Sequence, residues 1–388
     1  MKIDAGISNE DDKGEVCRVM VVDDSAIARG IVTRTLNEAP DISVVASVPN
    51  GLMALKTLGS HDIDVVVLDI EMPELDGLSA LPRMLELYPQ LKVIMVSAAS
   101  QKDADISLKT MAMGAADYVE KPKAGLGGAE AFYDELVRKV RLHGGAAAPG
   151  APSKRAAGPA KPAKPQSAAA PQAPASAVAS FSNNRRKETF PRPEVIAIGS
   201  STGGPQALAE VLKDLPPSVS QPILVTQHMP ATFTALLAQH MTRYAGRLAA
   251  EARDGERIEP GRIYIAPGGK HLVAEQGAAG GILIRLDDGP PENSCKPAVD
   301  PMLRSLARIY GDRLLTIILT GMGCDGLKGC EAVVNAGGRV MAQDRETSVV
   351  WGMPGAVAQA GLCRDVLPLR QIGSALKRIA GGETNERA

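Results

Sequence analysis

The segment EVIAIGSSTGGPQAL (residues 194–208) has the pattern of a buried strand, a tight turn of small residues and a helix. Its apolar run is of strand length, and its glycines permit a sharp turn. A helix that begins at such a turn presents backbone N–H groups and the positive end of its dipole to a negative charge. The segment therefore predicts an α/β fold with an anion or oxyanion held at this turn.

The alternation of strands and helices continues from this segment to the C-terminus. Expected strands are Val195–Ile198, Ile223–Thr226, Ile263–Ala266, Ile282–Arg285, Thr316–Leu319 and Arg339–Ala342. Expected helices are Gln206–Asp214, Thr232–Tyr244, Pro301–Tyr310, Cys324–Asn335 and Pro354–Ala360. Residues 191–388 thus form a doubly wound α/β domain with a mainly parallel sheet.

The N-terminal segment, residues 1–143, alternates in the same way. Helical stretches such as Ala26–Asn37 and Leu78–Leu87 separate short apolar runs at Arg18–Val22, Ile42–Ala46, Val65–Leu68, Val93–Val96 and Tyr118–Val119. Five β/α repeats predict a second parallel sheet, covered by helices on both faces.

Residues 144–190 separate the two domains. The part from 144 to 180 is more than half Ala and Pro and lacks Asp, Glu, Leu, Ile and Phe, so it cannot bury enough apolar surface to fold. An extended, semi-flexible linker with polyproline character is expected; recurring prolines oppose the alternative of an Ala-rich helix. The basic run Arg185–Lys187 is read as solvated charge, with contact to an acidic partner left open.

Composition excludes several classes of protein. The net charge of −1 divides into −8 for 1–143, +6 for 144–194 and +1 for 195–388, so neither domain has the basic surface expected of a nucleic-acid binder. No apolar run reaches the roughly 18–20 residues of a membrane span, and the acidic N-terminus argues against a secretory signal. The five cysteines contain no C-x-x-C pair, which argues against a disulfide scaffold or a four-thiolate zinc site. A cytoplasmic protein is expected.

Polar residues follow the expected strands of the first domain. Because ligands collect at the carboxyl ends of parallel strands, these side chains should converge: Asp23, Asp24, Asp69, Ser97 and Lys121. Clustered carboxylates suit Mg²⁺. Asp69 could then attack a phosphoryl donor, with Ser97 and Lys121 receiving the transferred oxygens. The alternative is that these residues only cap helices.

The motifs VMVVDDSAIAR, VVVLDIEMPELDG, MVSA and DYVEKP resemble the receiver domain of bacterial response regulators. The resemblance implies a flavodoxin-like (βα)5 fold, phosphorylation of Asp69, and Mg²⁺ held by Asp24, Asp69 and the backbone carbonyl of Glu71 with help from Asp23. It also places Tyr118 at the family's switch aromatic, with a half-buried strand residue as the alternative.

A possible serine nucleophile occurs in the second domain. Residues 199–203 fit G-x-S-x-G with Ser201 at the centre, although a Gly-rich anion-binding turn would look similar. His228 directly follows the strand PILVTQ and is the candidate base; His271 is a second candidate, whereas His240 lies within a helical pattern. Asp325 follows LLTIILTGMGC at the same sheet edge. The order Ser–His–Asp differs from that of the α/β-hydrolases.

The motifs IGSSTGGP, TQHMP, YIAPGGKH, KPAVD, LTGMGCDG and AQDRETSVVWGMP resemble the chemotaxis methylesterase (CheB) family. The resemblance implies catalysis by Ser201, His228 and Asp325, with Thr202 beside the nucleophile and the N–H of Met322 in the oxyanion hole. Two features depart from the family pattern: Cys324 stands where Asn usually precedes the Asp, and the linker is longer and richer in Ala and Pro.

The same resemblance implies a reaction and its control. The expected reaction is hydrolysis of γ-glutamyl methyl esters on methyl-accepting chemoreceptors, with deamidation of glutamines by the same residues and no cofactor for either. A chemotaxis histidine kinase would phosphorylate the receiver, which otherwise covers the active-site edge. We expect a monomer without membrane insertion. The alternatives are an esterase for another ester, an inactive receptor-binding scaffold and a regulator with a DNA-binding output; the near-neutral charge and β/α repeats of the second domain oppose the last.

Overall fold

The computed structural model describes residues 16–98, 100–122, 129–145, 191–213, 215–278 and 280–381. Both expected domains fall in one compact unit. The predicted linker, including Arg185–Lys187, lies outside the described residues apart from positions 144 and 145.

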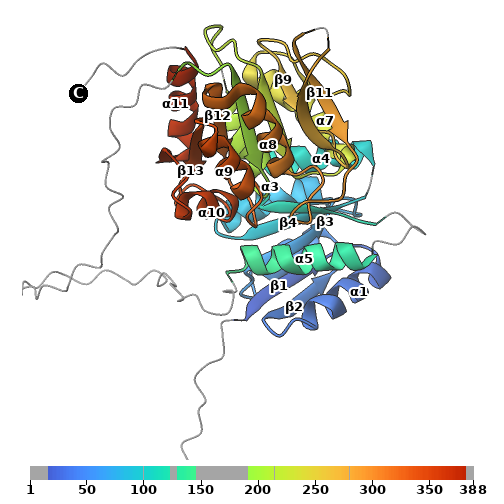
Figure 1. Ribbon diagram of the computed structural model, residues 1–388. Coiled ribbons are helices and arrows are strands. Elements are labelled where there is room, and N and C mark those ends of the chain that lie inside the picture. The colour runs from blue at the N-terminus through green and yellow to red at the C-terminus, as the bar shows by residue number, and fades with distance from the viewer. Residues whose placement is uncertain are drawn as a thin grey trace, which may run out of the picture. The chain divides into compact units, whose positions relative to one another are not determined.

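The first domain is a five-stranded parallel sheet with the strand order β2-β1-β3-β4-β5. The strands are β1 (Cys17–Val22), β2 (Ile42–Val48), β3 (Val65–Asp69), β4 (Lys92–Ser97) and β5 (Asp117–Glu120). The helices are α1 (Ala26–Asn37), α2 (Gly51–Leu58), α3 (Gly77–Leu87), α4 (Gln101–Ala112) and α5 (Ala129–His143) (Figure 1). The predicted (βα)5 fold is confirmed.

Local sequence explains where these elements begin. The side chains of Ser25, Asn50 and Asp76 accept hydrogen bonds from backbone N–H groups in the first turns of α1, α2 and α3. Strand β3 reads VVVLD and is buried along its whole length, as expected for a central strand covered by helices on both faces. Asp69 is the last residue of this buried strand.

The second domain contains a seven-stranded parallel sheet with the order β14-β13-β12-β6-β7-β9-β8. Its strands are β6 (Val195–Ser200), β7 (Ile223–Gln227), β8 (Ala249–Glu251), β9 (Ile263–Ile265), β12 (Leu314–Ile318), β13 (Arg339–Gln343) and β14 (Asp365–Leu367). Strands β7, β9 and β8 lie on one side of β6, and the later strands β12, β13 and β14 lie on its other side. Ligands of such sheets bind where the order reverses, which is here the carboxyl end of β6 beside β12.

Within its described residues, the second domain also contains six helices and a hairpin. The helices are α6 (Gly204–Leu212), α7 (Ala231–Ala245), α8 (Val299–Tyr310), α9 (Leu327–Asn335), α10 (Met353–Gln359) and α11 (Leu369–Gly381), with a short 3₁₀ turn at Gly311–Arg313. Strands β10 (His271–Gln276) and β11 (Ile282–Asp287) pair only with each other and are antiparallel.

The structure corrects two details of the sequence prediction. The strand expected at Ile282–Arg285 forms, but in the β10–β11 hairpin outside the main sheet. The helix expected from Cys324 begins at Leu327, because Gly326 adopts a φ of 92° and Asp325 is held in a turn by other contacts. Strands β8, β10 and β14 and helix α11 were not predicted.

The cores consist mainly of aliphatic side chains, as the low aromatic content predicts. Strands β6, β7 and β12 are buried throughout. This burial fixes the positions of their carboxyl ends. Within the described residues, no helix combines the length and apolar character needed to span a membrane.

Candidate active site and phosphoryl-acceptor site

Ser201 occupies the turn between β6 and α6. Its backbone N–H donates to the carbonyl of Thr320, just beyond β12, at 3.0 Å. Gly203 has a φ of 75°, which a side chain would strain. A Cβ on Gly204 would lie 1.9 Å from Oε1 of Gln227. Two glycines are therefore required to bring Ser201 to the start of the helix at the sheet edge.

His228 follows β7 and is tied to the serine turn through Gln227. The His228 N–H donates to the Ser200 carbonyl at 3.1 Å. The Gln227 amide accepts from Ser200 Oγ at 2.6 Å and donates to the Ser201 carbonyl at 2.9 Å. Sequence reasoning missed this buried glutamine, although it lies within the TQHMP motif. Its contacts fix the turns that carry Ser201 and His228 relative to each other.

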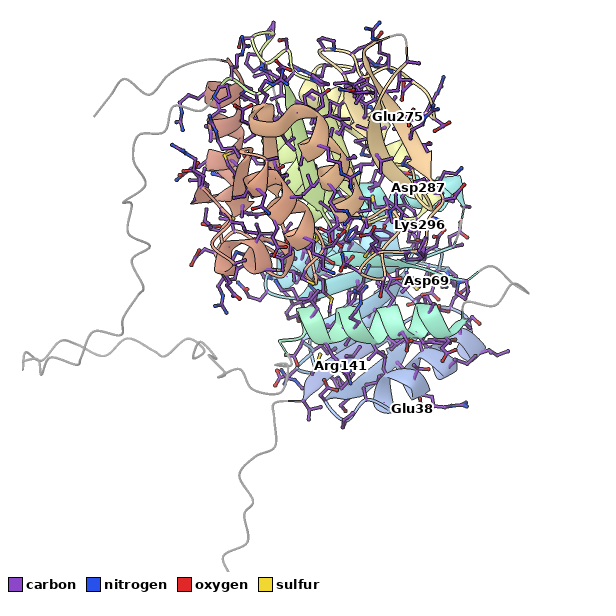
Figure 2. All side chains as sticks on the ribbon, viewed as in Figure 1. Glu38, Asp69, Arg141, Glu275, Asp287 and Lys296 are labelled. Carbon is purple, nitrogen blue, oxygen red and sulfur yellow. The ribbon has the colours of Figure 1, made fainter. Side chains whose placement is uncertain are left out.

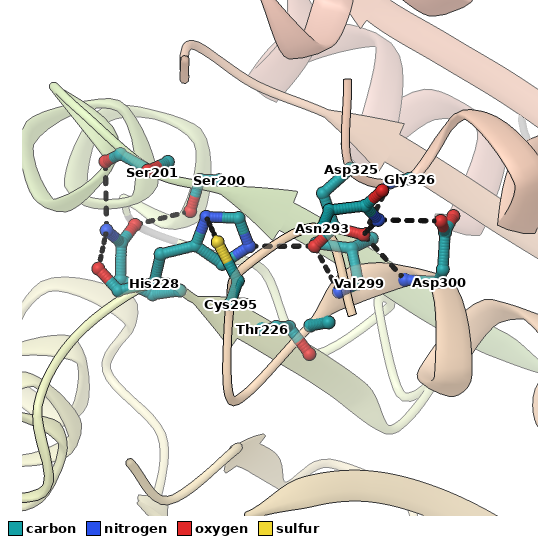
Figure 3. Close-up of polar contacts among 12 residues, drawn as sticks. Ser200, Ser201, Thr226, His228, Asn293, Cys295, Val299, Asp300, Asp325 and Gly326 are labelled. Atoms are coloured by element: carbon teal, nitrogen blue, oxygen red, sulfur yellow. Dashed lines mark hydrogen bonds and ion pairs between the residues drawn. The ribbon is translucent and has the colours of Figure 1, made fainter. Parts of the chain in front are cut away.

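The His228 ring pairs with Asp325 through Nε2, which lies 2.8 Å from Oδ2 (Figure 3). The other ring nitrogen, Nδ1, lies 3.4 Å from Sγ of Cys295. Among the described residues, no hydrogen bond joins Ser201 Oγ to the ring. The structure thus contains an assembled His–Asp pair, with the candidate nucleophile at the same edge but not yet bonded to it.

Asp325 is held by backbone and side-chain donors as well as by His228. The N–H groups of Val299 and Asp300, at the N-terminus of α8, donate to its carboxylate at 2.6 and 3.2 Å. The side-chain amide of Asn293 donates to Oδ1 at 2.9 Å. These contacts explain why the segment around Asp325 is a turn rather than the first turn of α9.

The pKa values of this pair follow from its contacts. Burial by itself would raise the pKa of Asp325, but the hydrogen bonds from His228 and the α8 backbone lower it below its usual value. Burial by itself would lower the pKa of His228, but Asp325 and then Cys295 stabilise the protonated ring and raise the pKa to about 9. The pair is therefore ionic in its resting form.

His271, the second candidate base, has both ring nitrogens occupied by backbone. Nδ1 accepts from the N–H of Ala298 at 3.1 Å, and Nε2 donates to the carbonyl of Pro290 at 2.9 Å. The ring therefore joins the two ends of the loop that carries Asn293 and Cys295. These contacts favour a structural role for His271 and leave His228 as the candidate base. His240, on α7, lies 3.5 Å from Asp105.

Three other predicted residues lie around Ser201. Thr202 is buried, and its carbonyl accepts from Thr320 Oγ1 at 3.0 Å. Met322 is half-buried beside the site; the oxyanion role of its N–H stays a prediction. Cys324 is exposed, whereas its neighbour Asp325 is buried and fully bonded, so the unusual residue does not disturb the His–Asp pair.

Ser201, His228 and Asp325 line one cleft of about 690 Å³. Met322 and Cys295 also line it, and side chains of β5 and α5 form its other wall. Arg138 of α5 donates to the sulfur of Met322 at 3.4 Å. The cleft thus lies between the predicted catalytic residues and the first domain.

The first domain contacts the second next to this cleft. The rings of Tyr118 and Phe233 stack with their centroids 4.5 Å apart. Thr232 Oγ1 donates to Glu120 at 3.1 Å, and the amide of Gln206 donates to the Met111 carbonyl at 2.9 Å. Tyr118 is buried, so its ring serves as a packing residue, while a switch role stays a prediction.

The acidic residues of the first domain converge as the strand ends predict. Asp23, Asp24 and Asp69 offer carboxylate oxygens within 4.8 Å of one another. Lys121 Nζ lies 2.9 Å from Asp23 and 2.8 Å from Asp69, which lies at the end of β3 (Figure 2). Burial raises the pKa of Asp69 even beside Lys121.

This cluster fits a magnesium ion and a phosphoryl group. Carboxylate oxygens in a compact set are the donors that Mg²⁺ prefers. The hydroxyl of Ser97 is buried and has no hydrogen-bond partner among the described residues, which suits it to donate a hydrogen bond to a phosphoryl oxygen. The predicted ligand role of the Glu71 carbonyl stays a prediction.

Comparison with known proteins identifies the family of each domain. A family model described as CheB methylesterase matches residues 196–376, and one described as response regulator receiver domain matches residues 19–125. The protein-glutamate methylesterase/protein-glutamine glutaminase of Azospirillum brasilense is 53% identical over 376 residues, covering 95% of this chain and 93% of that protein. The protein-glutamate methylesterase/protein-glutamine glutaminase of group 2 operon of Rhodospirillum centenum is 53% identical over 371 residues, with 94% of each chain covered. The crystal structure of the Thermotoga maritima CheB methylesterase catalytic domain is 42% identical, covers 48% of this chain and 98% of that one, and has a TM-score of 0.47. With a receiver domain before its α/β domain and this similarity over nearly its whole length, the chain belongs to the CheB methylesterase family.

Proposed function

We propose that this chain is a chemotaxis protein-glutamate methylesterase and protein-glutamine glutaminase controlled by phosphorylation. It hydrolyses γ-glutamyl methyl esters on chemoreceptors to glutamate and methanol, and it deamidates specific glutamines. The observation that carries the proposal is the His228–Asp325 pair, 2.8 Å apart, in the cleft that also contains Ser201. The names of the relatives give both activities.

The reaction begins when Ser201 Oγ attacks the ester carbonyl carbon and its proton passes to His228. Because Nε2 already bonds Asp325, the nitrogen that receives the proton is Nδ1. Asp325 holds the ring and stabilises the imidazolium. The N–H of Met322 and the α6 turn stabilise the oxyanion. His228 then returns the proton to the departing methanol. In the second half of the reaction, water attacks the acyl-enzyme carbonyl carbon in the same way and releases glutamate and Ser201.

Control by the receiver starts with transfer of a phosphoryl group from a chemotaxis histidine kinase to Asp69. Mg²⁺ at this site would neutralise negative charge on the phosphoryl donor. Asp24, Asp69 and the Glu71 carbonyl would hold the ion, while Ser97 and Lys121 bind phosphoryl oxygens. The contacts of Tyr118 and Arg138 with the second domain support a covered cleft in the unphosphorylated state. Phosphorylation opens it by stabilising the uncovered state more than the covered one. The enzyme acts as a cytoplasmic monomer.

Methanol release from methylated receptor membranes tests this function. With Mg²⁺ present, the full chain should release methanol faster after a small acyl phosphate is added. Asp69→Asn should release methanol at the basal rate with or without the donor, because the amide cannot be phosphorylated. Equal release by the wild type with and without the donor would reject regulation by phosphorylation. No release in either condition would reject the esterase.

The unphosphorylated enzyme should become more active as the pH rises. The base works only as neutral imidazole, and the contacts of His228 raise its pKa to about 9. Below pH 9 the ring is protonated in most molecules. In that range kcat/KM should rise about tenfold per pH unit, and it should level off near pH 9. Initial rates of methanol release, corrected for spontaneous ester hydrolysis, measure this profile. A plateau already reached near the ordinary histidine pKa of about 6.5 would contradict it.

A further inference from the structure

The loop from Pro290 to Ala298 places two side chains against the catalytic pair. Asn293 donates to Asp325 at 2.9 Å, and Cys295 Sγ lies 3.4 Å from Nδ1 of His228 (Figure 3). Neither residue belongs to a strand or a helix.

The backbone holds this loop in one particular shape. Asn293 and Ser294 have φ values of 51° and 62°, in the left-handed region that non-glycine residues rarely adopt. His271 bonds both ends of the loop. Such conformations persist only where surrounding contacts determine them. The position of Cys295 is therefore set by the fold rather than by a free loop.

The two ring nitrogens of His228 have different partners. Nε2 carries a proton, because the Asp325 carboxylate can only accept a hydrogen bond. Nδ1 is left for the chemistry, and in this structure it faces a thiol instead of the Ser201 hydroxyl. A thiol can donate to Nδ1 of the neutral ring, and its sulfur can accept from Nδ1–H of the protonated ring. Cys295 can thus bond the base in both of its protonation states.

On the basis of the esterase function proposed above, we propose that Cys295 is a positioning residue for His228. Its sulfur holds the Nδ1 side of the ring in either protonation state of the ring, until the hydroxyl of Ser201 takes its place. Cys295 is half-buried and lines the same cleft as Ser201.

The other cysteines have different surroundings. Cys17 and Cys330 are buried and Cys363 is half-buried, and burial raises the pKa of all three thiols above the ordinary value. Cys324 is exposed. It is therefore an internal control for thiol reactivity, close in sequence to Asp325.

The pH profile of the full-length protein distinguishes positioning from packing. Cys295→Ala removes the acceptor for Nδ1–H, which lowers the pKa of His228 and should move the acid limb of kcat/KM to lower pH by about half to one unit. The loosened ring should also lower kcat by about tenfold with little change in KM. Cys295→Ser keeps a donor and acceptor and should restore both. A fall in kcat without a shifted limb, or a serine variant that behaves like alanine, would overturn the proposal.

Alkylation tests the contact without any receptor substrate. When Cys295 reacts with iodoacetamide, the thiol gives its proton to solvent, sulfur bonds to the methylene carbon and iodide leaves, while Nδ1–H of the protonated His228 ring faces the reacting sulfur. His228→Gln should slow alkylation of Cys295 near pH 7 and leave that of Cys324 unchanged, as followed by mass spectrometry of the full chain. If the wild type releases methanol but its Cys295 is alkylated no faster than that of His228→Gln, the role of Cys295 would be overturned. Inactive wild type with His228-dependent alkylation would instead overturn the esterase function.

Discussion

Replacing Ser201 by alanine should lower kcat for methyl-ester hydrolysis by about 10⁵–10⁶-fold. The variant has no oxygen to form the acyl-enzyme, and only the oxyanion donors and substrate binding remain. The side chain is only half-buried and its backbone contacts to Thr320 and Gln227 do not involve the hydroxyl, so folding should be unaffected. Single-turnover methanol release and the thermal unfolding midpoint measure the two effects.

Ser200→Ala is the matched control for this experiment. It removes the neighbouring hydroxyl, which donates to Gln227 at 2.6 Å and belongs to a buried residue outside the lining of the cleft. It should cost about 1 kcal/mol of stability and change kcat by less than about tenfold. If Ser200→Ala abolished turnover while Ser201→Ala retained it, the nucleophile would be wrongly assigned.

Replacing Asp325 by asparagine should lower kcat by about 10⁴-fold. The carboxylate accepts from His228 with one oxygen and from the α8 backbone with both. An amide has a single oxygen, so its NH₂ group must face either the ring or the helix N–H groups. Where the NH₂ group faces the ring, the ring loses its Nε2–H partner, its tautomer changes, and its pKa falls. Besides the loss of kcat, the acid limb of the residual kcat/KM profile should move to lower pH.

Asp300→Asn provides the comparison for that variant. Asp300 is a second buried carboxyl in the same cluster; it accepts from Gly329 at 2.7 Å and from Asn293 at 3.0 Å. Burial raises its pKa, and it has no bond to His228 among the described contacts. Its kcat should therefore fall by less than about tenfold, with an unchanged acid limb. An effect as large as that of Asp325→Asn would mean that general damage to the cluster, rather than loss of the His228 partner, explains both.

The sequence predicts the positions of site residues that follow strands better than the positions of those that lie in loops. Ser201 and His228 directly follow β6 and β7, and Asp69 ends β3, so parallel topology alone brings each to a sheet edge. Asn293 and Cys295 follow no strand. Their placement depends on left-handed backbone and on the His271 ring, neither of which a hydrophobic pattern encodes.

The errors in secondary structure have physical causes of the same kind. The segment at Ile282–Arg285 has the composition of a sheet strand, but it pairs with His271–Gln276, whose polar and apolar residues alternate weakly. Cys324–Gly326 is compatible with helix locally, yet the N–H groups of α8 bind Asp325 and keep it in a turn. In both places a distant part of the chain overrides local propensity.

The strand order of the second sheet has a consequence for synthesis of the protein. Strand β6 pairs with β7 on one side and with β12 on the other, and β12 leaves the ribosome only after α6, α7, the hairpin and α8 have been made. Until then β6, which is apolar and buried in the finished fold, has an unpaired edge open to other nascent chains. The receiver domain does not wait for β12, because all five of its strands are translated before β6. The growing chain therefore carries all strands of the receiver domain before β6 of the second sheet can pair on both sides.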